Sequence, residues 1–443
     1  MQKWKDLEPE NFQTSAVICQ FMDTLLKLVS QDCSIHPEIS ADFETLQAIA
    51  NPKKTLGTGK LTTVKSFKKK SIFLTIKGST KPGFGGSAVD KRGIIKPYDE
   101  FIYKIYCADH TYTSVKLLQG AKVQEIVACA SEKLCLGNDP ILCEVKSNGE
   151  RIVLHEKSNC VVPSLSVNGR LFIAPREHQD ALTPLPEQEG PTSGTMANLE
   201  VMDAKDMAVI MTQYDWDVFF GIQEQEFLNK IFGISVYPDG MCPNLDNFLQ
   251  RFSKLQHWVV TEIVLLPNLG KRVQLLRKLI KLAQHLKDLN NLMSFMAVMF
   301  GLGHLAVSRL SQTWEKIPGK LKKVFSELES VVDSSRNHRA YRMVAARINT
   351  PAIPYIPLLI KDMKFLNEGS ETYYDSMVNF EKMRMIAQVL RTVRYCRQQP
   401  MKLECIDDTK VVADMKIYIK EFQAIDNQKI LTNLSHKCEP RKG

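Results

Sequence analysis

Residues 353–384 read IPYIPLLIKDMKFLNEGSETYYDSMVNFEKMR, and this stretch decides the fold of the larger part of the chain. Pro354 and Pro357 exclude a regular helix through the apolar run, so residues 355–360 are expected to be extended or to form a first helical turn packed into a core. A charged surface segment follows and ends at Gly369. After it, apolar residues recur at helical spacing, namely Phe380, Met383, Ala387, Leu390 and Val393. The pattern predicts two helices joined by a turn, for which an ordinary surface hairpin is the simplest interpretation.

The composition is that of a globular chain with several domains. Its 443 residues exceed a typical domain of ~100–150, and 44% apolar with 24% charged residues allows packed cores. No apolar run reaches the ~18 residues that span a bilayer, and the N-terminus lacks a signal-peptide core. Eleven cysteines occur without a C-x-x-C pair, which favours reduced thiols in the cytosol or nucleus and no metal site. Neither paired catalytic carboxylates nor a Ser/His/Asp set is evident, so we expect no cofactor and no covalent chemistry.

Two N-terminal segments carry separate signals. Residues 1–35 are expected to be helical, because apolar residues there fall at spacings of four and three. Residues 48–92 hold eleven lysines and arginines against one acid, Asp90, which accounts for the whole net charge of +9. Their glycines lack the G-x-x-x-x-G-K-[ST] pattern of a phosphate loop. We interpret this segment as a basic flexible linker, either simply solvated or in contact with anionic lipid, nucleic acid or a nuclear import receptor.

The remaining chain divides into a β-rich and a helical part. Within residues 93–176, strand-like runs and one helix follow in the order 100–109, 111–118, helix 123–134, 141–145, 152–154 and 170–174. The first five of these elements follow the order β-β-α-β-β, which is that of a ubiquitin-like roll, an α+β fold. Residues 195–438 predict an all-helical, bowl-shaped domain from helix-period segments at 203–230, 244–264, 270–289, 290–309, 319–332, 376–396 and 410–434.

The hairpin residues also resemble a known family. I-P-x-x-P-L-L-I-K-D-M, then E-G, then V-N-F-E-K-M-R-M-I-A is similar to the catalytic domain of Ras-family guanine nucleotide exchange factors, closest to the Rap-directed branch that includes the cyclic-AMP-activated exchange proteins. The resemblance runs from about Leu182 to the C-terminus through ordered motifs, among them LTPLPEQEGPTSG at 182–194, KRVQLLRKL at 271–279, AVSRLSQTW at 306–314 and IDNQKILTNLSHKCEPR at 425–441. It implies that the chain promotes GDP release from a Rap-family GTPase. No segment resembles a cyclic-nucleotide-binding domain, so regulation by cyclic AMP is not expected.

The resemblance assigns roles on the hairpin. An exchange factor lowers the barrier to GDP release through contacts that form only when the phosphate and Mg²⁺ sites of the GTPase are disrupted. Glu368 corresponds to a carboxylate that accepts hydrogen bonds from donors freed of the phosphate. Lys364 stands where many relatives carry an apolar residue against the metal site, so a cation is expected near the vacated Mg²⁺ position. The catalytic set is Glu368, Lys364 and Asn367, and Lys361 and Asp362 are expected to contact the GTPase.

A second surface is implied for the other switch region of the GTPase. Arg272 aligns with an arginine that pairs with an acidic switch residue in relatives, and Met296, Gly303, His304 and Ser308 fall at contact positions. Cyclic-AMP-activated relatives read G-L-S-N where this chain reads G-L-G-H. His304 therefore either tunes partner choice or is a satisfied helix-end histidine.

The N-terminal parts set the remaining expectations. Residues 1–35 are similar to the last part of a Ras exchanger motif, and residues 93–176 to a Ras-association domain. There, an exposed second strand would pair with a strand of a GTP-bound GTPase, M-Ras or another Ras protein, and Lys104 and Lys116 would meet its acidic switch residues. Two other functions stay open: a non-catalytic adaptor that uses this domain, and a basic nucleic-acid or membrane binder. We expect no DNA partner and a cytoplasmic location, with nuclear and membrane-recruited forms left open.

Overall fold

The computed structural model describes residues 94–96, 98–137, 139–237, 239–375, 377–404, 406 and 409–440. The helix expected at 1–35 and the basic linker at 48–92 lie outside these residues. In the described ranges, no helix combines the length and the apolar character needed to cross a bilayer. Nor do those ranges contain a group of three His, Cys, Asp or Glu side chains placed to hold a metal ion.

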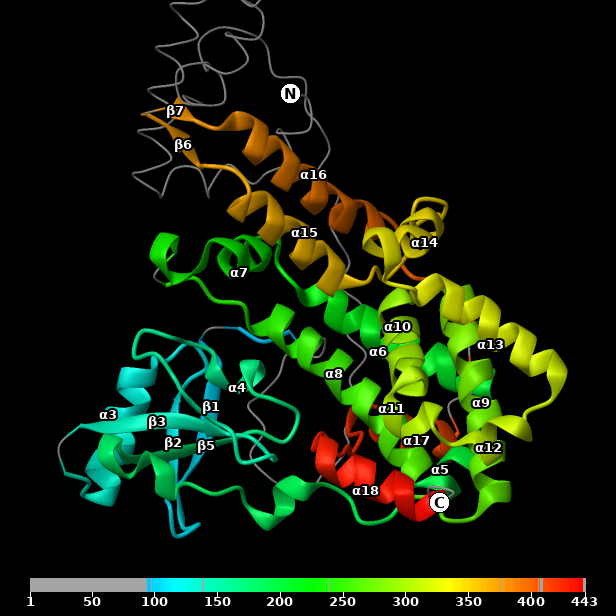
Figure 1. The fold of residues 1–443 in the computed structure, drawn as a ribbon. Helices are drawn as coiled ribbons and strands as arrows, with labels where there is room; N and C mark the ends of the chain where they lie inside the picture. Colours follow the sequence, from blue (N-terminus) through cyan, green and yellow to red (C-terminus); the bar gives the residue numbers. More distant parts are fainter. Residues whose placement is uncertain are drawn as a thin grey trace, which may run out of the picture. The chain divides into compact units, whose positions relative to one another are not determined.

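Residues 100–175 form a mixed five-stranded sheet with one main helix (Figure 1). The order of the strands is β2-β1-β5-β3-β4, in which β1 and β5 are parallel and the other neighbours antiparallel. The elements are β1 (Glu100–Tyr106), β2 (Tyr112–Leu118), α3 (Val123–Leu134), β3 (Pro140–Val145), β4 (Arg151–Val153), α4 (Val161–Ser164) and β5 (Arg170–Pro175). The predicted strands and helix are all present, although β1 ends before residue 109 and the short helix α4 was not predicted. The strand β2 lies at an edge of the sheet, as expected for an exposed second strand.

Both faces of this sheet are covered, which explains why β3 is buried along nearly its whole length. On one face, Tyr103 and Leu142 pack with Ile126 of α3. On the other face, Phe172 packs with Leu182 and Leu185, which belong to the segment that leads toward the helical part. That segment contains two short 3₁₀ helices, η4 (Arg176–Ala181) and η5 (Pro186–Glu189).

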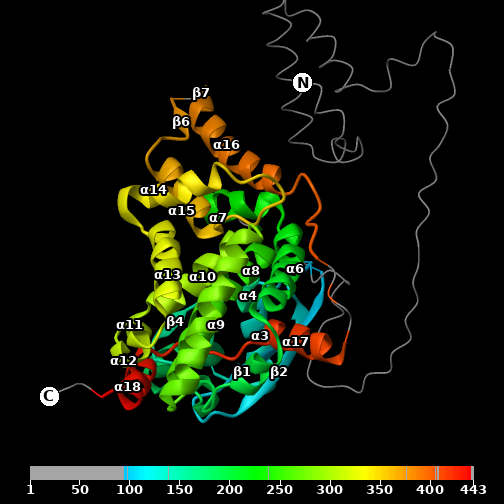
Figure 2. The same ribbon diagram turned by 90° about the vertical axis from the view of Figure 1, so that its right-hand side faces the viewer.

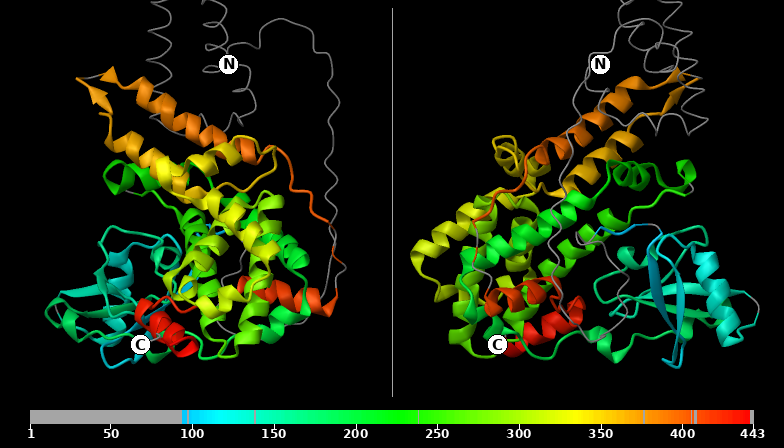
Figure 3. Two further views of the ribbon diagram at one scale, coloured as in Figure 1. Left: turned by 45° about the vertical axis from the view of Figure 1, so that its right-hand side comes forward. Right: turned by 180° about the vertical axis from the view of Figure 1, so that it is seen from behind.

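The rest of the described chain is helical apart from one two-stranded ribbon (Figures 2 and 3). The helix α10 is central: residues 292–299 are all buried, and the helix packs against α8 and α9. The elements are α5 (Met196–Val201), α6 (Ala204–Gly221), α7 (Glu224–Val236), α8 (Pro243–Val264), α9 (Leu269–Asp288), α10 (Leu292–Gly303), α11 (Leu305–Ser308), α12 (Ser311–Glu315), α13 (Gly319–Val332), α14 (Ser335–Ala345), α15 (Ile356–Glu368), β6 (Tyr373–Tyr374), β7 (Met377–Val378), α16 (Phe380–Cys396), α17 (Lys410–Lys420) and α18 (Gln428–Cys438).

Three of the predicted helices are each two helices in the structure. The broken segments are those expected at 203–230, 290–309 and 410–434. The first break follows from Glu226, a buried carboxylate that accepts hydrogen bonds from the backbone N–H groups of Gln223, Asn244 and Leu245 at 3.0, 2.8 and 2.9 Å. Such a cap starts a new helix without interrupting the apolar spacing. For this reason, periodicity alone did not reveal it.

Candidate functional site

The predicted hairpin is formed by α15 and α16, which lie side by side with the β6–β7 ribbon at their shared end (Figure 1). α15 begins at Ile356, so Pro357 occupies the first turn, where its missing N–H removes no helical hydrogen bond. The backbone N–H of Tyr355 donates to the hydroxyl of the buried Tyr341 at 2.7 Å. The apolar run that follows is packed into the core through Ile356, Leu358 and Ile360. This confirms the expectation of a first-turn segment packed into a core.

The turn after α15 is fixed by side chains from the start of α16. Asn379 caps α16, and its own backbone N–H donates to the carbonyl of Thr372 at 2.9 Å. The Nζ of Lys382 donates to the carbonyl oxygens of Asn367 and Ser370, at 2.9 and 2.8 Å, and to Oγ1 of Thr372 at 2.8 Å. The turn is thereby held to the first turn of α16 by both backbone and side-chain hydrogen bonds.

The predicted apolar face of α16 is right at Val393, which is buried, but wrong toward the start of the helix. Phe380 is 77% exposed and Ala387 is also exposed. The buried positions are Lys382, Ile386, Val393 and Cys396. The first of them is a lysine, so counting apolar residues selected a neighbouring stripe in the first turns of the helix.

The base of the hairpin is joined to α14. Two guanidinium nitrogens of Arg342 donate to the two carboxylate oxygens of Asp362, both at 2.8 Å. Nζ of Lys361 donates to Oδ1 of Asn337 at 3.2 Å. Burial and the charges of Lys361 and Arg342 lower the pKa of His338, which lies beside this contact. Asp362, predicted to contact a GTPase, is therefore engaged within the protein, while Lys361 remains exposed.

The structure brings Glu368, Lys364 and Lys361 together on one exposed face of α15. These three residues line a shallow pocket of about 320 Å³ that also includes Pro357, Ile360 and Phe365. Glu368 is the last residue of α15 and is exposed to solvent. Asn367 is turned toward α7, where its Nδ2 donates to the carbonyl of Ile231 at 3.4 Å. Of the three residues predicted as catalytic, Glu368 and Lys364 are therefore surface charges, whereas Asn367 holds α15 to α7 through its side-chain amide.

Large apolar side chains are exposed around the same end of the hairpin. They are Phe365, Tyr373, Tyr374, Met377, Val378 and Phe380, and we call them the tip patch. Clustered exposed apolar side chains of this kind typically mark a surface that binds another protein. The tip patch was not predicted from the sequence, because Phe380 was counted in the apolar stripe of the second helix and the ribbon was not predicted.

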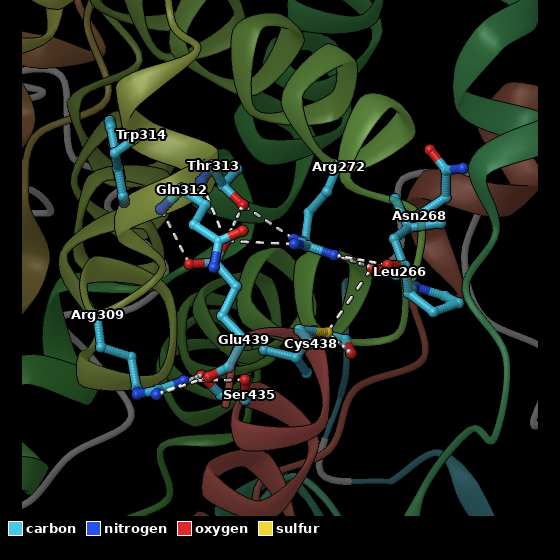
Figure 4. A network of polar contacts seen from close by, with 12 residues as sticks. Leu266, Asn268, Arg272, Arg309, Gln312, Thr313, Trp314, Ser435, Cys438 and Glu439 are labelled. Atoms are coloured by element: carbon cyan, nitrogen blue, oxygen red, sulfur yellow. Dashed lines mark hydrogen bonds and ion pairs between the residues drawn. The ribbon is translucent and has the colours of Figure 1, made fainter. Parts of the chain in front are cut away.

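Arg272, predicted to pair with a GTPase, is buried and is engaged within the protein. Its side chain is 1% exposed and forms an ion pair with Glu439, with 3.2 Å between Nη2 and Oε1 (Figure 4). Its Nε donates to Oγ1 of Thr313 at 3.0 Å, and its Nη1 donates to the carbonyl of Leu266 at 2.8 Å. Although burial acts to raise it, hydrogen bonds from Thr313, Gln312 and Arg272 hold the pKa of Glu439 below its usual value.

The other residues of the predicted second surface fall into two groups. Met296, predicted to contact a GTPase, is fully buried inside α10. Gly303, the last residue of α10, and Ser308, the last residue of α11, are both exposed. Between them, His304 caps α11: its Nδ1 accepts from the backbone N–H of Ala306 at 3.2 Å, and its Nε2 lies 2.9 Å from Oε1 of Gln428. The structure therefore supports the helix-end interpretation of His304.

Lys104 and Lys116 both lie on the surface that carries the edge strand β2. Nζ of Lys104 sits 4.8 Å from the ring centroid of Tyr106 and 4.1 Å from that of Tyr112. Lys116 is exposed and pairs with Glu100 of β1 at 2.7 Å. Among the described residues, positive charge and an edge strand therefore coincide on this surface.

Comparison with known proteins identifies the family of the helical part. Residues 206–384 match the RasGEF domain. Rap guanine nucleotide exchange factor-like 1 from Pongo pygmaeus is 38% identical over 360 residues, which cover 80% of this chain and 78% of that protein. The chain belongs to the RasGEF-domain family.

Two further relatives extend the similarity beyond the RasGEF domain. Rap guanine nucleotide exchange factor 5 from Homo sapiens is 37% identical over 441 residues, covering 99% of this chain and 73% of that protein. Rap guanine nucleotide exchange factor 3 from Homo sapiens is 34% identical over 462 residues, covering 99% of this chain and 49% of that protein. The chain thus spans about half the length of this last relative. The hairpin, with Glu368 and Lys364, lies within the residues that match the RasGEF domain.

Proposed function

We propose that this chain is a guanine nucleotide exchange factor that promotes GDP release from a Rap-family small GTPase. The observation that carries the proposal is the exposed end of the α15–α16 hairpin, where Glu368 and Lys364 share one pocket beside the tip patch. This surface lies in a RasGEF domain, and the relatives of the chain are named as Rap exchange factors. The function needs no cofactor, since no covalent bond is made or broken.

The hairpin would act as a wedge. α7, α14 and α16 brace α15 through Asn367, Asp362 and Lys382, so the helix resists displacement when it pushes against a switch loop. The exposed carboxylate of Glu368 can accept hydrogen bonds from GTPase donors that held the phosphate, and Lys364 brings a cation toward the vacated Mg²⁺ site. A preference of ~5.5 kcal/mol for the nucleotide-free GTPase would accelerate release about 10⁴-fold.

The direct test is release of labelled GDP from a panel of Rap and Ras proteins by the full chain, without a second messenger. The wild-type chain is expected to accelerate release from a Rap protein, and Glu368→Ala is expected to lower that acceleration about tenfold or more, within the usual range for a lost charge-assisted contact. The thermal midpoint should stay unchanged because Glu368 is exposed. Glu327→Ala, an exposed substitution on α13, serves as the matched control. Intrinsic release rates with every GTPase, from a folded wild-type chain, would overturn the proposal.

We further propose that residues 93–176 form a ubiquitin-like roll that binds a GTP-bound Ras-family GTPase, such as M-Ras. The strand order, with β2 at an edge, and the positions of Lys104 and Lys116 support this proposal. Binding should require the GTP state, because that state orders the switch that offers a partner strand. Titration with GTP- and GDP-loaded M-Ras at two salt concentrations tests it, and Lys116→Glu should weaken binding. Equal binding to both nucleotide states would leave this part of the chain as a spacer.

The location of the protein is a separate proposal. We place the chain in the cytoplasm, with recruitment to membranes through the basic segment at 48–92, whose positive charge attracts anionic lipid. Binding to anionic vesicles that is lost at high salt would support this, and equal binding to neutral vesicles would contradict it.

A further inference from the structure

Lys382 is a charged side chain that is only 2% exposed, although it lies in a hairpin with exposed residues on both sides. Its three hydrogen bonds reach Asn367, Ser370 and Thr372, and these residues bracket Glu368. We propose that Lys382 is a positioning residue that fixes the end of α15 and thereby sets the direction in which Glu368 is presented to the GTPase. This inference rests on the proposed exchange function and deepens it.

The location of the three acceptors supports a positioning role. α15 ends at Glu368, so the carbonyl of Asn367 is one of the last helical carbonyls that lack a partner within the helix. A cation at this end also interacts favourably with the helix dipole. Because Ser370 and Thr372 belong to the segment beyond the helix, the same ammonium group fixes both sides of Glu368 at once.

A lysine fits this position better than other side chains. Its ammonium group carries three donors on one nitrogen, and three oxygens at 2.8–2.9 Å accept from it. Lys382 also lies over the ring of Phe232 in α7, with 6.0 Å between Nζ and the ring centroid. Since Asn367 bonds to Ile231 of the same helix, α7, α15 and α16 meet around this single ammonium group.

The main experiment is a double-mutant cycle on the full chain with Lys382→Met, Glu368→Ala and the combination. Methionine keeps most of the side-chain volume and removes the three donors. Lys382→Met should lower the maximal rate of GDP release about tenfold, while the chain concentration that gives half-maximal rate changes by less than about twofold. If Lys382 acts through Glu368, the double variant should be no slower than the slower single variant. Lys320→Met, an exposed substitution on α13, is the matched control.

A readout without any GTPase separates this inference from the proposed function. Amide hydrogen exchange at residues 367–372 should become faster in Lys382→Met than in wild type, while exchange in α8 and α10 stays unchanged. If Lys382→Met does not fold, Thr372→Val removes one of the three acceptors and should give the same changes in smaller size. The positioning role would be overturned if the rate losses of the two single variants multiply in the double variant. It would also be overturned if amide hydrogen exchange at residues 367–372 stays unchanged. A wild-type chain that accelerates GDP release from no GTPase would instead refute the proposed function. The role of Lys382 would then be decided by amide hydrogen exchange alone.

Discussion

Glu368 and Arg272 are both charged residues of motifs that resemble the exchange-factor family, yet their surroundings are opposite. Glu368 ends a helix in solvent, whereas Arg272 is enclosed by Thr313, Leu266 and Glu439. The sequence identified both as charged motif residues, but burial of Arg272 depends on Glu439, which is 167 positions away in the chain. A motif gives no account of such a long-range partner. The sequence could therefore predict the exposed position of Glu368 but not the buried position of Arg272.

At the scale of this residue pair, Glu439→Gln should lower the free energy of unfolding by about 3–5 kcal/mol, because it leaves the buried charge of Arg272 uncompensated. The double variant Arg272→Met/Glu439→Gln should lose less free energy of unfolding than the sum of the losses in the two single variants. Urea unfolding of the three variants measures both effects, with Glu327→Gln as an exposed control expected to change the free energy by less than about 0.5 kcal/mol. A Glu439→Gln variant as stable as the control would contradict the assigned ion pair.

At the scale of elements, the sequence located the hairpin but not its packing. The two prolines, the glycine turn and the helical spacing after residue 380 were enough to predict two helices with a turn, because these signals are local. The face that α16 buries was not predictable in this way. Its register depends on the acceptors that Lys382 meets in the turn after α15, and the spacing of apolar residues contains no information about them. For His304 the sequence left a helix-end role and a role in partner choice equally open, and its contacts with Ala306 and Gln428 favour the helix-end role, as the cap of α11.

That cap predicts a dependence on pH. Burial lowers the pKa of His304, although its hydrogen bond to Gln428 opposes the shift, and Nδ1 must remain unprotonated to accept from Ala306. The folded state thus binds a proton on His304 less readily than the unfolded state, so this contribution to stability is complete above about pH 6.5 and is lost as pH falls through the window below it. Thermal unfolding is measured at pH 7.5 and at pH 5.5 for both proteins. The midpoint should fall between these pH values by about 2 °C less in His304→Gln than in wild type. Identical falls in the two proteins would exclude the cap as a titrating contact.

At the scale of the molecule, the α+β part and the helical part are joined by hydrogen bonds from the segment just before α18. Asp426 accepts from Oγ of Ser147 at 2.6 Å and from Nδ2 of Asn168 at 3.0 Å. Nδ2 of Asn427 donates to the carbonyl of Ser147 at 3.0 Å. The two parts could be distinguished in the sequence, since one alternates as strands and the other has helical periods. Their contact could not be predicted, because its partners are separated by 258–280 positions.

If these hydrogen bonds hold the two parts together, Asp426→Ala should separate their unfolding. The substitution removes acceptors for Ser147 and Asn168 at a partly buried contact, and loss of two or three such hydrogen bonds corresponds to about 2 kcal/mol. Calorimetry should then show two transitions, or one broadened transition, where the wild-type chain shows a more cooperative one. Asp414→Ala, an exposed change on α17, should leave the wild-type profile unaltered.

GDP release should be retained in Asp426→Ala, because the hairpin is braced by α7, α14 and α16 and not by the α+β part. A loss of exchange without a change in the unfolding profile would show that the contact acts on the hairpin and not only on the attachment of the two parts.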